Sequence, residues 1–388
     1  MKKLVKLILI VVIIIENLQM GCMGIENVVE SSARSSIIVS SKSLRILSGK
    51  NIYEQLGIAS VTKIMTLIIA LENSDLNSVV KVSSNAANTG EASMHLVEGE
   101  KITLENLLYG LMLASGNDAA VAVAEHVAGS IEEFVPLMNQ KAYQVGAKKT
   151  FFVNPNGLTI SENIYNKSTA YDLALITSYG FENPKFAEIV STKTKSIQRE
   201  NFGYTEFFEN HNRFLKMYPG ADGVKTGYTK KSGRCLVTSV TKDNLRLVAV
   251  TLCDPNDWYD HKCMYDFAFG NYKNEIVAKK DEILGKIKVL NGVEKFVNLV
   301  PLQDYYFPVK AEENMKMTVC AEKVISAPIK KDVVIGELKL EILGKECARF
   351  PLIAQKEIML KNTFVEKNES YFKTNFNVLF KTWIFTVK

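Results

Sequence analysis

Residues 58–71 read IASVTKIMTLIIAL, an apolar run that contains few polar side chains. The run predicts a buried helix from Ser60 to Leu71 at the centre of a folded domain. Residues three apart share one face of a helix, so the Ser60 hydroxyl should lie beside the Lys63 amine. Apolar surroundings favour the neutral form of a lysine, which can then take a proton from a serine. We therefore predict that Ser60 is a nucleophile and Lys63 its base.

The pattern serine-x-x-lysine is weak evidence by itself, because it begins at four places, Ser60, Ser78, Ser239 and Ser370. Ser239 lies near the end of a predicted strand, where residues three apart point to opposite faces. Ser78 falls in a polar loop and Ser370 in the last segment of the chain, so we expect both to be solvated. Only Ser60 is followed by an apolar helix.

A second polar group, Ser115-Gly116-Asn117, lies between two predicted helices. The Ser115 hydroxyl can relay a proton, and the Asn117 amide can bind a substrate carbonyl. The same spacing occurs at residues 83–85 and 161–163, where a helix cap or an Asx turn is the simpler interpretation. The pattern is common, so its position along the chain has to decide which of the three occurrences belongs to an active site.

The third group is Lys225-Thr226-Gly227, on a predicted strand that follows a turn. Lys225 adds positive charge, Thr226 can bond a carboxylate, and Gly227 allows a peptide backbone to approach closely. Taken alone, Lys225 could equally be a solvated surface lysine. The similar string at residues 231–233 falls in a predicted hairpin turn, where no strand edge is available.

Hydrophobic patterns predict an α+β fold for residues 30–278. Residues 36–47 are typical of a strand hairpin, and residues 223–252 of a three-stranded antiparallel meander. Thr103 is the expected N-cap of the first helix after residue 100. The predicted helices after Thr103 are 104–113, 119–128, 132–145, 169–179 and 258–272. We expect an antiparallel sheet flanked by helices on both sides.

A chain of 388 residues exceeds what one hydrophobic core usually organises, which favours a second domain. Short alternating stretches predict that this domain is a small all-β module, a β-sandwich of residues 283–365. The stretches are 286–290, 316–319, 333–342 and 349–352.

The two ends of the chain carry patterns of export and membrane contact. Three lysines before residue 7 precede an apolar run to residue 15, which is typical of a secretory signal peptide over residues 1–22. A buried core helix is the alternative. Residues 370–388 mix aromatic and lysine side chains, as in an amphipathic tail that contacts a membrane, although a packed tail would look similar. We expect an extracytoplasmic protein associated with the outer face of the cell membrane.

Composition excludes several functions. The net charge of +5 is dispersed along the chain, so we expect no nucleic-acid partner. The six cysteines lack CxxC pairs and metal-ligand spacing with histidine, so we expect no metal and no cofactor. Buried hydrophobic thiols are the simpler interpretation of most of these cysteines.

The three polar groups, in the order SxxK, SxN and KTG, resemble those of the penicillin-recognising serine enzymes. Within that group the chain is similar to the low-molecular-mass D-alanyl-D-alanine carboxypeptidases. The similarity extends to residues 59–66, 113–120 and 219–229, and the small β domain and the tail match that family's layout. The resemblance implies a serine β-lactamase/transpeptidase-like fold, a peptidoglycan stem-peptide substrate, and β-lactams as covalent inhibitors.

The resemblance also implies roles for the site residues. Ser60 would be acylated, Lys63 would take its proton, and Ser115 would relay that proton to the departing D-alanine. By the same resemblance, Asn117 would hold the substrate peptide, and Lys225 with Thr226 would bind the terminal carboxylate of that peptide. Gly227 belongs to the same motif, and the backbone amides of Ser60 and Tyr228 would form the oxyanion hole.

One departure from the family and two rival functions remain. Asn156 stands where the family often carries a histidine, which we interpret as a change in loop or substrate fit. A class A β-lactamase would need a glutamate for deacylation, and Glu162 with Asn166 fits its ExxxN pattern loosely. A non-catalytic module that binds the cell wall or β-lactams is the other alternative.

Overall fold

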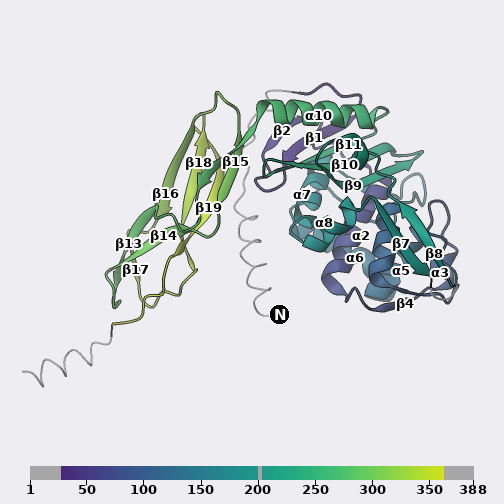
Figure 1. The fold of residues 1–388 in the computed structure, drawn as a ribbon, viewed down its shortest axis with the longest axis horizontal. Helices are drawn as coiled ribbons and strands as arrows, with labels where there is room; N and C mark the ends of the chain where they lie inside the picture. The colour runs from purple at the N-terminus through teal and green to yellow at the C-terminus, as the bar shows by residue number, and fades with distance from the viewer. Residues whose placement is uncertain (1–27, 200–202, 362–388) are drawn as a thin grey trace, which may run out of the picture. The chain divides into compact units, whose positions relative to one another are not determined.

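The computed structural model describes residues 28–199 and 203–361 (Figure 1). The predicted signal peptide and the predicted amphipathic tail lie outside these residues. No helix within the described residues is long and apolar enough to cross a membrane.

The chain forms two compact units, each with its own structure. The first comprises the described residues up to Glu275 together with Pro308–Glu313. The second comprises Ile276–Phe307 and the described residues from Asn314 onward.

A five-stranded antiparallel sheet forms the centre of the first unit, in the order β2-β1-β11-β10-β9. Side chains alternate between the two faces of a strand, so Ile37 and Val39 enter a large core beneath the helices. Ile38, between them, enters a smaller core on the other face. The strands are β1 (Ser35–Ser40), β2 (Ile46–Lys50), β9 (Ala221–Thr229), β10 (Gly233–Lys242) and β11 (Leu245–Leu252).

Helices cover both faces of this sheet, as predicted (Figure 1). Helix α10 (Asp257–Asn271) packs on the face that carries Ile38. The larger core lies between the opposite face and a layer of helices with α2 at its centre. The helices of that layer are α2 (Lys63–Asn73), α4 (Leu104–Leu113), α5 (Asn117–Ala128), α6 (Ile131–Gln144), α7 (Ala170–Gly180) and α8 (Pro184–Ser191).

Local sequence signals place most of these elements within a few residues. The Thr103 hydroxyl accepts a hydrogen bond from Asn106 N and caps α4, as predicted. The hairpin β7–β8 was not predicted, because only Ile197 among the residues of β7 is buried and apolar. The elements of the first unit without a prediction are α8 and β3 (Leu56–Gly57), β4 (Val79–Lys81), α3 (Ser84–Ala87), β5 (Lys101–Thr103), β6 (Lys167–Ser168), β7 (Thr194–Arg199), β8 (Tyr204–Glu209) and α9 (Phe214–Met217).

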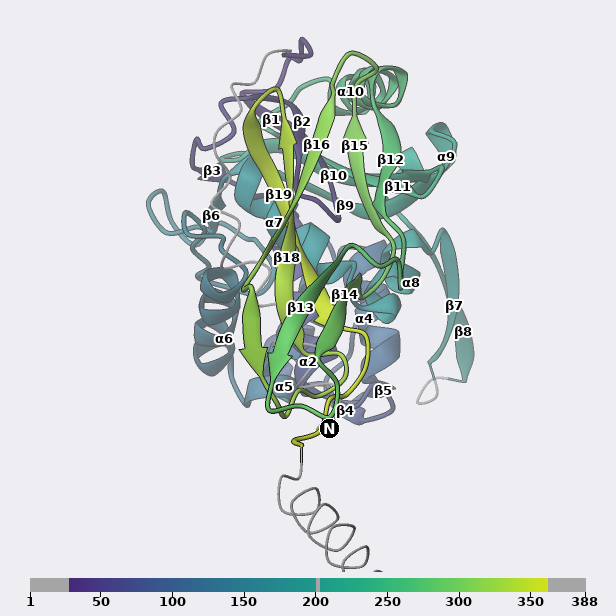
Figure 2. The same ribbon diagram turned by 90° about the vertical axis from the view of Figure 1, so that its left-hand side faces the viewer.

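The second unit is rich in β-structure, as predicted, and is built on a six-stranded sheet in the order β16-β18-β19-β14-β13-β17 (Figure 2). Strands β13 and β17 are parallel, whereas the other neighbours are antiparallel. The strands are β13 (Gly285–Leu290), β14 (Phe296–Pro301), β16 (Met315–Ala321), β17 (Val324–Ser326), β18 (Val334–Ile342) and β19 (Lys345–Ala354), with β12 (Lys273–Ala278) and β15 (Tyr305–Val309) at the division between the units.

A buried ion pair joins hairpin β7–β8 to the loop before β5. The Arg199 guanidinium donates two hydrogen bonds to the Glu100 carboxylate, at 2.5 and 2.8 Å, and both side chains are at most 1% exposed. Arg199 also donates to the carbonyl oxygens of Met94 and His95, each at 2.9 Å. The pair therefore holds the backbone of residues 94–95 in place.

Replacing Arg199 with methionine would leave the Glu100 carboxylate buried without this cation. We expect the free energy of unfolding to fall by about 3 to 5 kcal/mol, the usual cost of removing one partner from a buried ion pair. Denaturant unfolding monitored by circular dichroism measures the change.

Arg34 offers a matched control, because its ion pair with Glu54 is largely exposed. Arg34→Met should cost about 1 kcal/mol or less. Equal losses of stability in the two variants would contradict the role given to the Arg199 pair.

Candidate active site

Ser60 and Lys63 meet where a short 3₁₀ turn leads into helix α2. Ser60 lies in the turn η1 (Ala59–Thr62), and α2 begins at Lys63, so the predicted start of the α-helix at Ser60 was one turn too early. A 3₁₀ turn has three residues per turn, which places side chains three apart directly above one another. Lys63 Nζ lies 2.9 Å from Ser60 Oγ, so the structure brings the predicted pair together.

The Lys63 amine contacts three oxygen atoms. Besides Ser60 Oγ, it donates to the Asn117 side-chain oxygen at 2.7 Å and to the Asn156 carbonyl at 2.8 Å. Those two oxygens only accept, and a neutral amine has two N–H donors and one lone pair. In the neutral form both donors are therefore used, and the lone pair is left for the Ser60 hydroxyl proton.

The surroundings of Lys63 favour this neutral form. Its side chain is fully buried, and burial lowers its pKa well below the ordinary lysine value. The nearby Lys225 lowers the pKa of Lys63 further, because two like charges repel each other. Lys63 is thus set up to accept a proton rather than to carry one.

Two glycines press against the turn that carries Ser60. A Cβ atom on Gly157 would lie 2.0 Å from the Ala59 carbonyl oxygen, and one on Gly227 would lie 3.1 Å from Ser60 N. Gly157 also has a φ of +92°, which favours glycine. The sequence predicts that a substrate backbone approaches Gly227, and this stays a prediction. In the structure, the backbone that approaches Gly227 is the turn η1.

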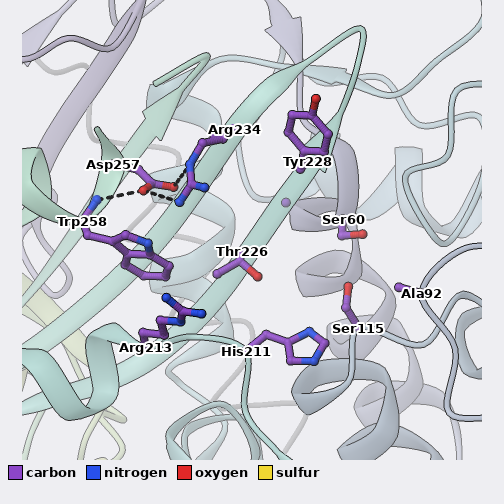
Figure 3. Close-up of a pocket in the computed structure, with 11 residues that line it drawn as sticks. Ser60, Ala92, Ser115, His211, Arg213, Thr226, Tyr228, Arg234, Asp257 and Trp258 are labelled. Atoms are coloured by element: carbon purple, nitrogen blue, oxygen red, sulfur yellow. Dashed lines mark hydrogen bonds and ion pairs between the residues drawn. The ribbon is translucent and has the colours of Figure 1, made fainter. Parts of the chain in front are cut away.

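Ser115 lies in the short connection between α4 and α5 and lines the same pocket as Ser60. Its φ of +60° is unusual for a residue with a side chain, so this loop is held in a strained conformation. Figure 3 shows the hydroxyls of Ser60 and Ser115 on the same side of the pocket. The arrangement places a second hydroxyl near the predicted nucleophile.

Asn117 is buried at the start of α5 and does not line the pocket. Its side-chain oxygen accepts from Lys63, and its amide group donates to the Gly90 carbonyl at 2.9 Å. Asn117 therefore orients the amine of Lys63 in this structure. Its binding of a substrate carbonyl stays a prediction.

The loop beside Asn117 is held from two sides. The neighbouring Asp118 carboxylate accepts hydrogen bonds from the backbone amides of Met94 and Leu96. On the other side, Arg199 binds the carbonyls of Met94 and His95. Because Asn117 N also bonds to the loop at the Ala92 carbonyl, the buried Arg199 ion pair supports the residues around Lys63.

Lys225, Thr226 and Gly227 lie on β9, which is an edge strand. Thr226, Gly227 and Tyr228 line the pocket, whereas Lys225 is 1% exposed and donates to the Thr226 carbonyl at 3.1 Å. Burial lowers the pKa of Lys225 to about 7. Lys225 is therefore only partly protonated near neutral pH, and its predicted contact with a carboxylate stays a prediction.

The pocket is a cavity of about 400 Å³ that runs from Ser60 along β9 (Figure 3). Its far side contains residues that sequence reasoning missed, because they come from separate segments without a shared motif. His211 and Arg213 lie between β8 and α9, and Trp258 lies in the first turn of α10. The remaining members of this set are Arg234 and Asp257, which form an ion pair at 2.7 Å.

The β-lactamase pattern is not assembled in this structure. The Glu162 side chain is exposed, and Asn166 is buried, with its amide group donating to Thr62 at 2.8 Å. Asn156 meets Lys63 through its backbone carbonyl, while its side-chain oxygen accepts from Leu158 N at 3.0 Å. A histidine at position 156 could therefore keep the contact with Lys63, which the backbone makes.

The other strings that resemble the motifs have structural roles. Ser239 Oγ, in β10, donates to the Asp222 carboxylate at 2.5 Å, and Ser83 caps α3. Ser78 donates to the Asp75 carbonyl at 2.6 Å and is partly exposed. Ser232 lies in the turn between β9 and β10, as predicted.

Within residues 28–199 and 203–361, no group of three or more His, Cys, Asp or Glu side chains could hold a metal ion. Cys235 is buried, as the hydrophobic interpretation expected, whereas Cys253 is exposed. The described cysteines are all free thiols.

Comparison with known proteins agrees with this geometry. Residues 24–256 match the family Peptidase_S11, D-alanyl-D-alanine carboxypeptidase, and residues 272–359 match the C-terminal domain of penicillin-binding protein 5. The chain is 37% identical to the D-alanyl-D-alanine carboxypeptidase DacF of Bacillus subtilis, over 86% of this chain and 87% of that protein. It is 29% identical to DacC of Escherichia coli, over 84% of each chain.

The fold is also similar to solved structures. Penicillin-binding protein 5 of Haemophilus influenzae matches with a TM-score of 0.73 and 25% identity, over 86% of this chain and 99% of that chain. The family match alone spans more than half of the 388 residues. The chain therefore belongs to the D-alanyl-D-alanine carboxypeptidases of peptidase family S11, which are serine-type enzymes, and it carries the C-terminal domain of penicillin-binding protein 5.

Proposed function

We propose that this carboxypeptidase removes the terminal D-alanine from peptidoglycan stem pentapeptides through an acyl-enzyme on Ser60. The contact of 2.9 Å between Lys63 Nζ and Ser60 Oγ, made by a buried amine, is the observation that carries the proposal. Membership of the family supports a peptide substrate and binding of β-lactams.

Acylation begins when Ser60 Oγ attacks the carbonyl carbon of the penultimate D-alanine. The hydroxyl proton passes to the neutral Lys63 amine, and the carbonyl oxygen becomes an oxyanion. When the C–N bond breaks, the proton reaches the departing amine of the terminal D-alanine through Ser115. Water then attacks the ester and releases the shortened peptide and the Ser60 hydroxyl.

The backbone amides of Ser60 and Tyr228 are the donors for the oxyanion. Strand β9 and turn η1 approach each other closely, since a Cβ on Gly227 would lie 3.1 Å from Ser60 N. A substrate that pairs with the open edge of β9 would place its scissile carbonyl between the two segments. This geometry supports the assignment of both amides.

The terminal carboxylate of the substrate lies next to Thr226, on the side of the pocket away from Ser60. Arg213 lines this side of the pocket and supplies a guanidinium there (Figure 3). The buried Lys225 adds a second positive charge when its amine is protonated. Positive charge at this end favours a free C-terminus over an internal peptide bond.

We also propose that the protein acts outside the cytoplasm, at the outer face of the cell membrane, with its tail in peripheral contact with the lipid surface. The proposal is supported by the basic and apolar residues before position 16 and by the aromatic, lysine-containing residues 370–388. Fractionation of cells that express the full chain or a chain ending at residue 361 tests it. The full chain should be found with membranes, and equal release of both forms would contradict the role of the tail.

Replacing Lys63 with alanine removes the proposed base. We expect the release of D-alanine from a pentapeptide that ends in D-Ala-D-Ala to slow by about 10³-fold, within the range for loss of a general base. Chromatography of the products measures free D-alanine and separates it from transpeptidated peptide.

Lys242 is the matched control, because residues 239–242 repeat the letters SVTK of residues 60–63 but lie on strand β10. Lys242→Ala should retain the activity of the natural chain. Comparable losses in both variants would remove Lys63 as the base.

The rate of acylation by benzylpenicillin should depend on the protonation of Lys63. The neutral amine is the active form, so the rate should rise with pH through the pKa of Lys63, which burial places well below the ordinary value. Lys225→Met removes the second cause of this lowering and should move the rising limb to higher pH. Stopped-flow acylation across a pH series measures the rising limb in the natural chain and in Lys225→Met. A rising limb at the same pH in both proteins would exclude the electrostatic coupling.

Glu162 should have no part in hydrolysis of the acyl-enzyme, because its side chain is exposed. We expect Glu162→Gln to leave the lifetime of the penicilloyl adduct unchanged and the natural chain to turn over nitrocefin poorly. Mass spectrometry should locate the adduct on Ser60. Sustained nitrocefin hydrolysis that is lost in Glu162→Gln would favour a β-lactamase, and absence of any adduct would favour a non-catalytic module.

A further inference from the structure

Two lysine ammonium groups lie over one aromatic ring, that of Tyr165, near the catalytic turn. Lys167 Nζ is 4.6 Å from the centre of the Tyr165 ring, and Lys231 Nζ is 5.4 Å from it. Lys167 belongs to the short strand β6, whereas Lys231 lies in the turn between β9 and β10. Two segments that are distant in sequence thus bring two positive charges to one ring.

The backbone connects this cluster to Ser60. Gly57 pairs with Lys167, and a Cβ on Gly57 would lie 3.3 Å from the Tyr165 ring. Ser60 follows Gly57 by three residues, a span of roughly 10 Å at most. The Tyr165 ring is therefore within reach of a peptide that is bound at Ser60.

The direction of the substrate leads toward the same cluster. Strand β9 is the open edge of an antiparallel sheet, so a bound peptide that continues the pattern runs antiparallel to β9. Its terminal carboxylate lies near Thr226, and its scissile carbonyl lies near Tyr228. The residues before the scissile bond therefore pass Tyr228 and approach the turn that contains Lys231.

The cluster has the charge to bind an anion. Neither Lys167 nor Lys231 makes an ion pair with a residue of the described ranges, and Lys231 is exposed. Ammonium groups at the face of an aromatic ring keep donors free for an oxygen acceptor. An extended peptide rises about 3.3 Å per residue, so the third residue before the scissile bond lies roughly 10 Å from Ser60, which is the distance of the cluster.

We propose that Tyr165, Lys167 and Lys231 form a subsite for a carboxylate on the stem peptide, carried by the third residue before the scissile bond. The subsite rests on the proposed acylation of Ser60. It adds that the peptide which remains bound to Ser60 carries an acidic group. It would select stem peptides with a free carboxylate over those in which the carboxylate is amidated.

Two synthetic peptides that end in D-Ala-D-Ala test the proposal, one with glutamate and one with glutamine as the third residue before the scissile bond. We expect the natural chain to show a kcat/KM about tenfold higher for the glutamate peptide, the effect of one charge-assisted contact. The preference should disappear in the double variant Lys167→Met/Lys231→Met and persist in Lys231→Arg. It should also weaken as salt concentration rises.

Lys81→Met is the control variant, since Lys81 is an exposed lysine on β4 and belongs to neither site. Labelling by benzylpenicillin verifies that the catalytic site of every variant is folded. A natural chain without the preference, or a double variant that retains it, would overturn the subsite while D-alanine release remains intact. Failure of the natural chain to release D-alanine from either peptide would instead overturn the proposed function and the subsite with it.

Discussion

The burial of one amine determines how the rest of the site is built. A lysine removed from water is costly to keep charged, and Lys63 is fully enclosed beneath the turn that carries Ser60. The neutral form of the amine avoids this cost, and its two N–H groups donate to Asn117 and Asn156. The remaining lone pair is directed at Ser60, so the same burial that destabilises the charge creates a base.

The surrounding segments hold Lys63 and its hydrogen-bond partners in position. The Asn156 carbonyl comes from a loop that needs Gly157 to pass the backbone of η1, and β9 needs Gly227 to do the same from the other side. Asn117 is held through the loop at residues 90–96, which Arg199 and Asp118 bind from opposite sides. Helix layer, loop and sheet edge therefore converge on a single serine.

Much of this could be predicted from the sequence, because local signals specify local structure. The apolar run after Ser60, the cap at Thr103 and the turn at residues 115–117 each determine their neighbours, and the elements lie close to the predicted bounds. The start of α2 was misplaced, since periodicity does not distinguish a 3₁₀ turn from the first turn of an α-helix. Hairpin β7–β8 was missed because it has little apolar alternation.

The far side of the pocket could not be predicted, since His211, Arg213 and Trp258 come together only through the fold. The same limit applies to the burial of Lys225 and Asn117, which the motifs alone would place at the substrate. A motif specifies which residues gather at a site. It does not specify which of their atoms face the substrate and which face one another.

The protonation state of Lys63 is the central claim, and nitrogen NMR of the protein with ¹⁵Nζ-labelled lysine measures it directly. The Lys63 signal can be assigned by its loss in Lys63→Met. We predict a neutral amine at the pH where Ser60 is acylated, with a titration far below that of the exposed lysines. A Lys63 signal that remains an ammonium up to the ordinary lysine range, about 10.4, would contradict the account.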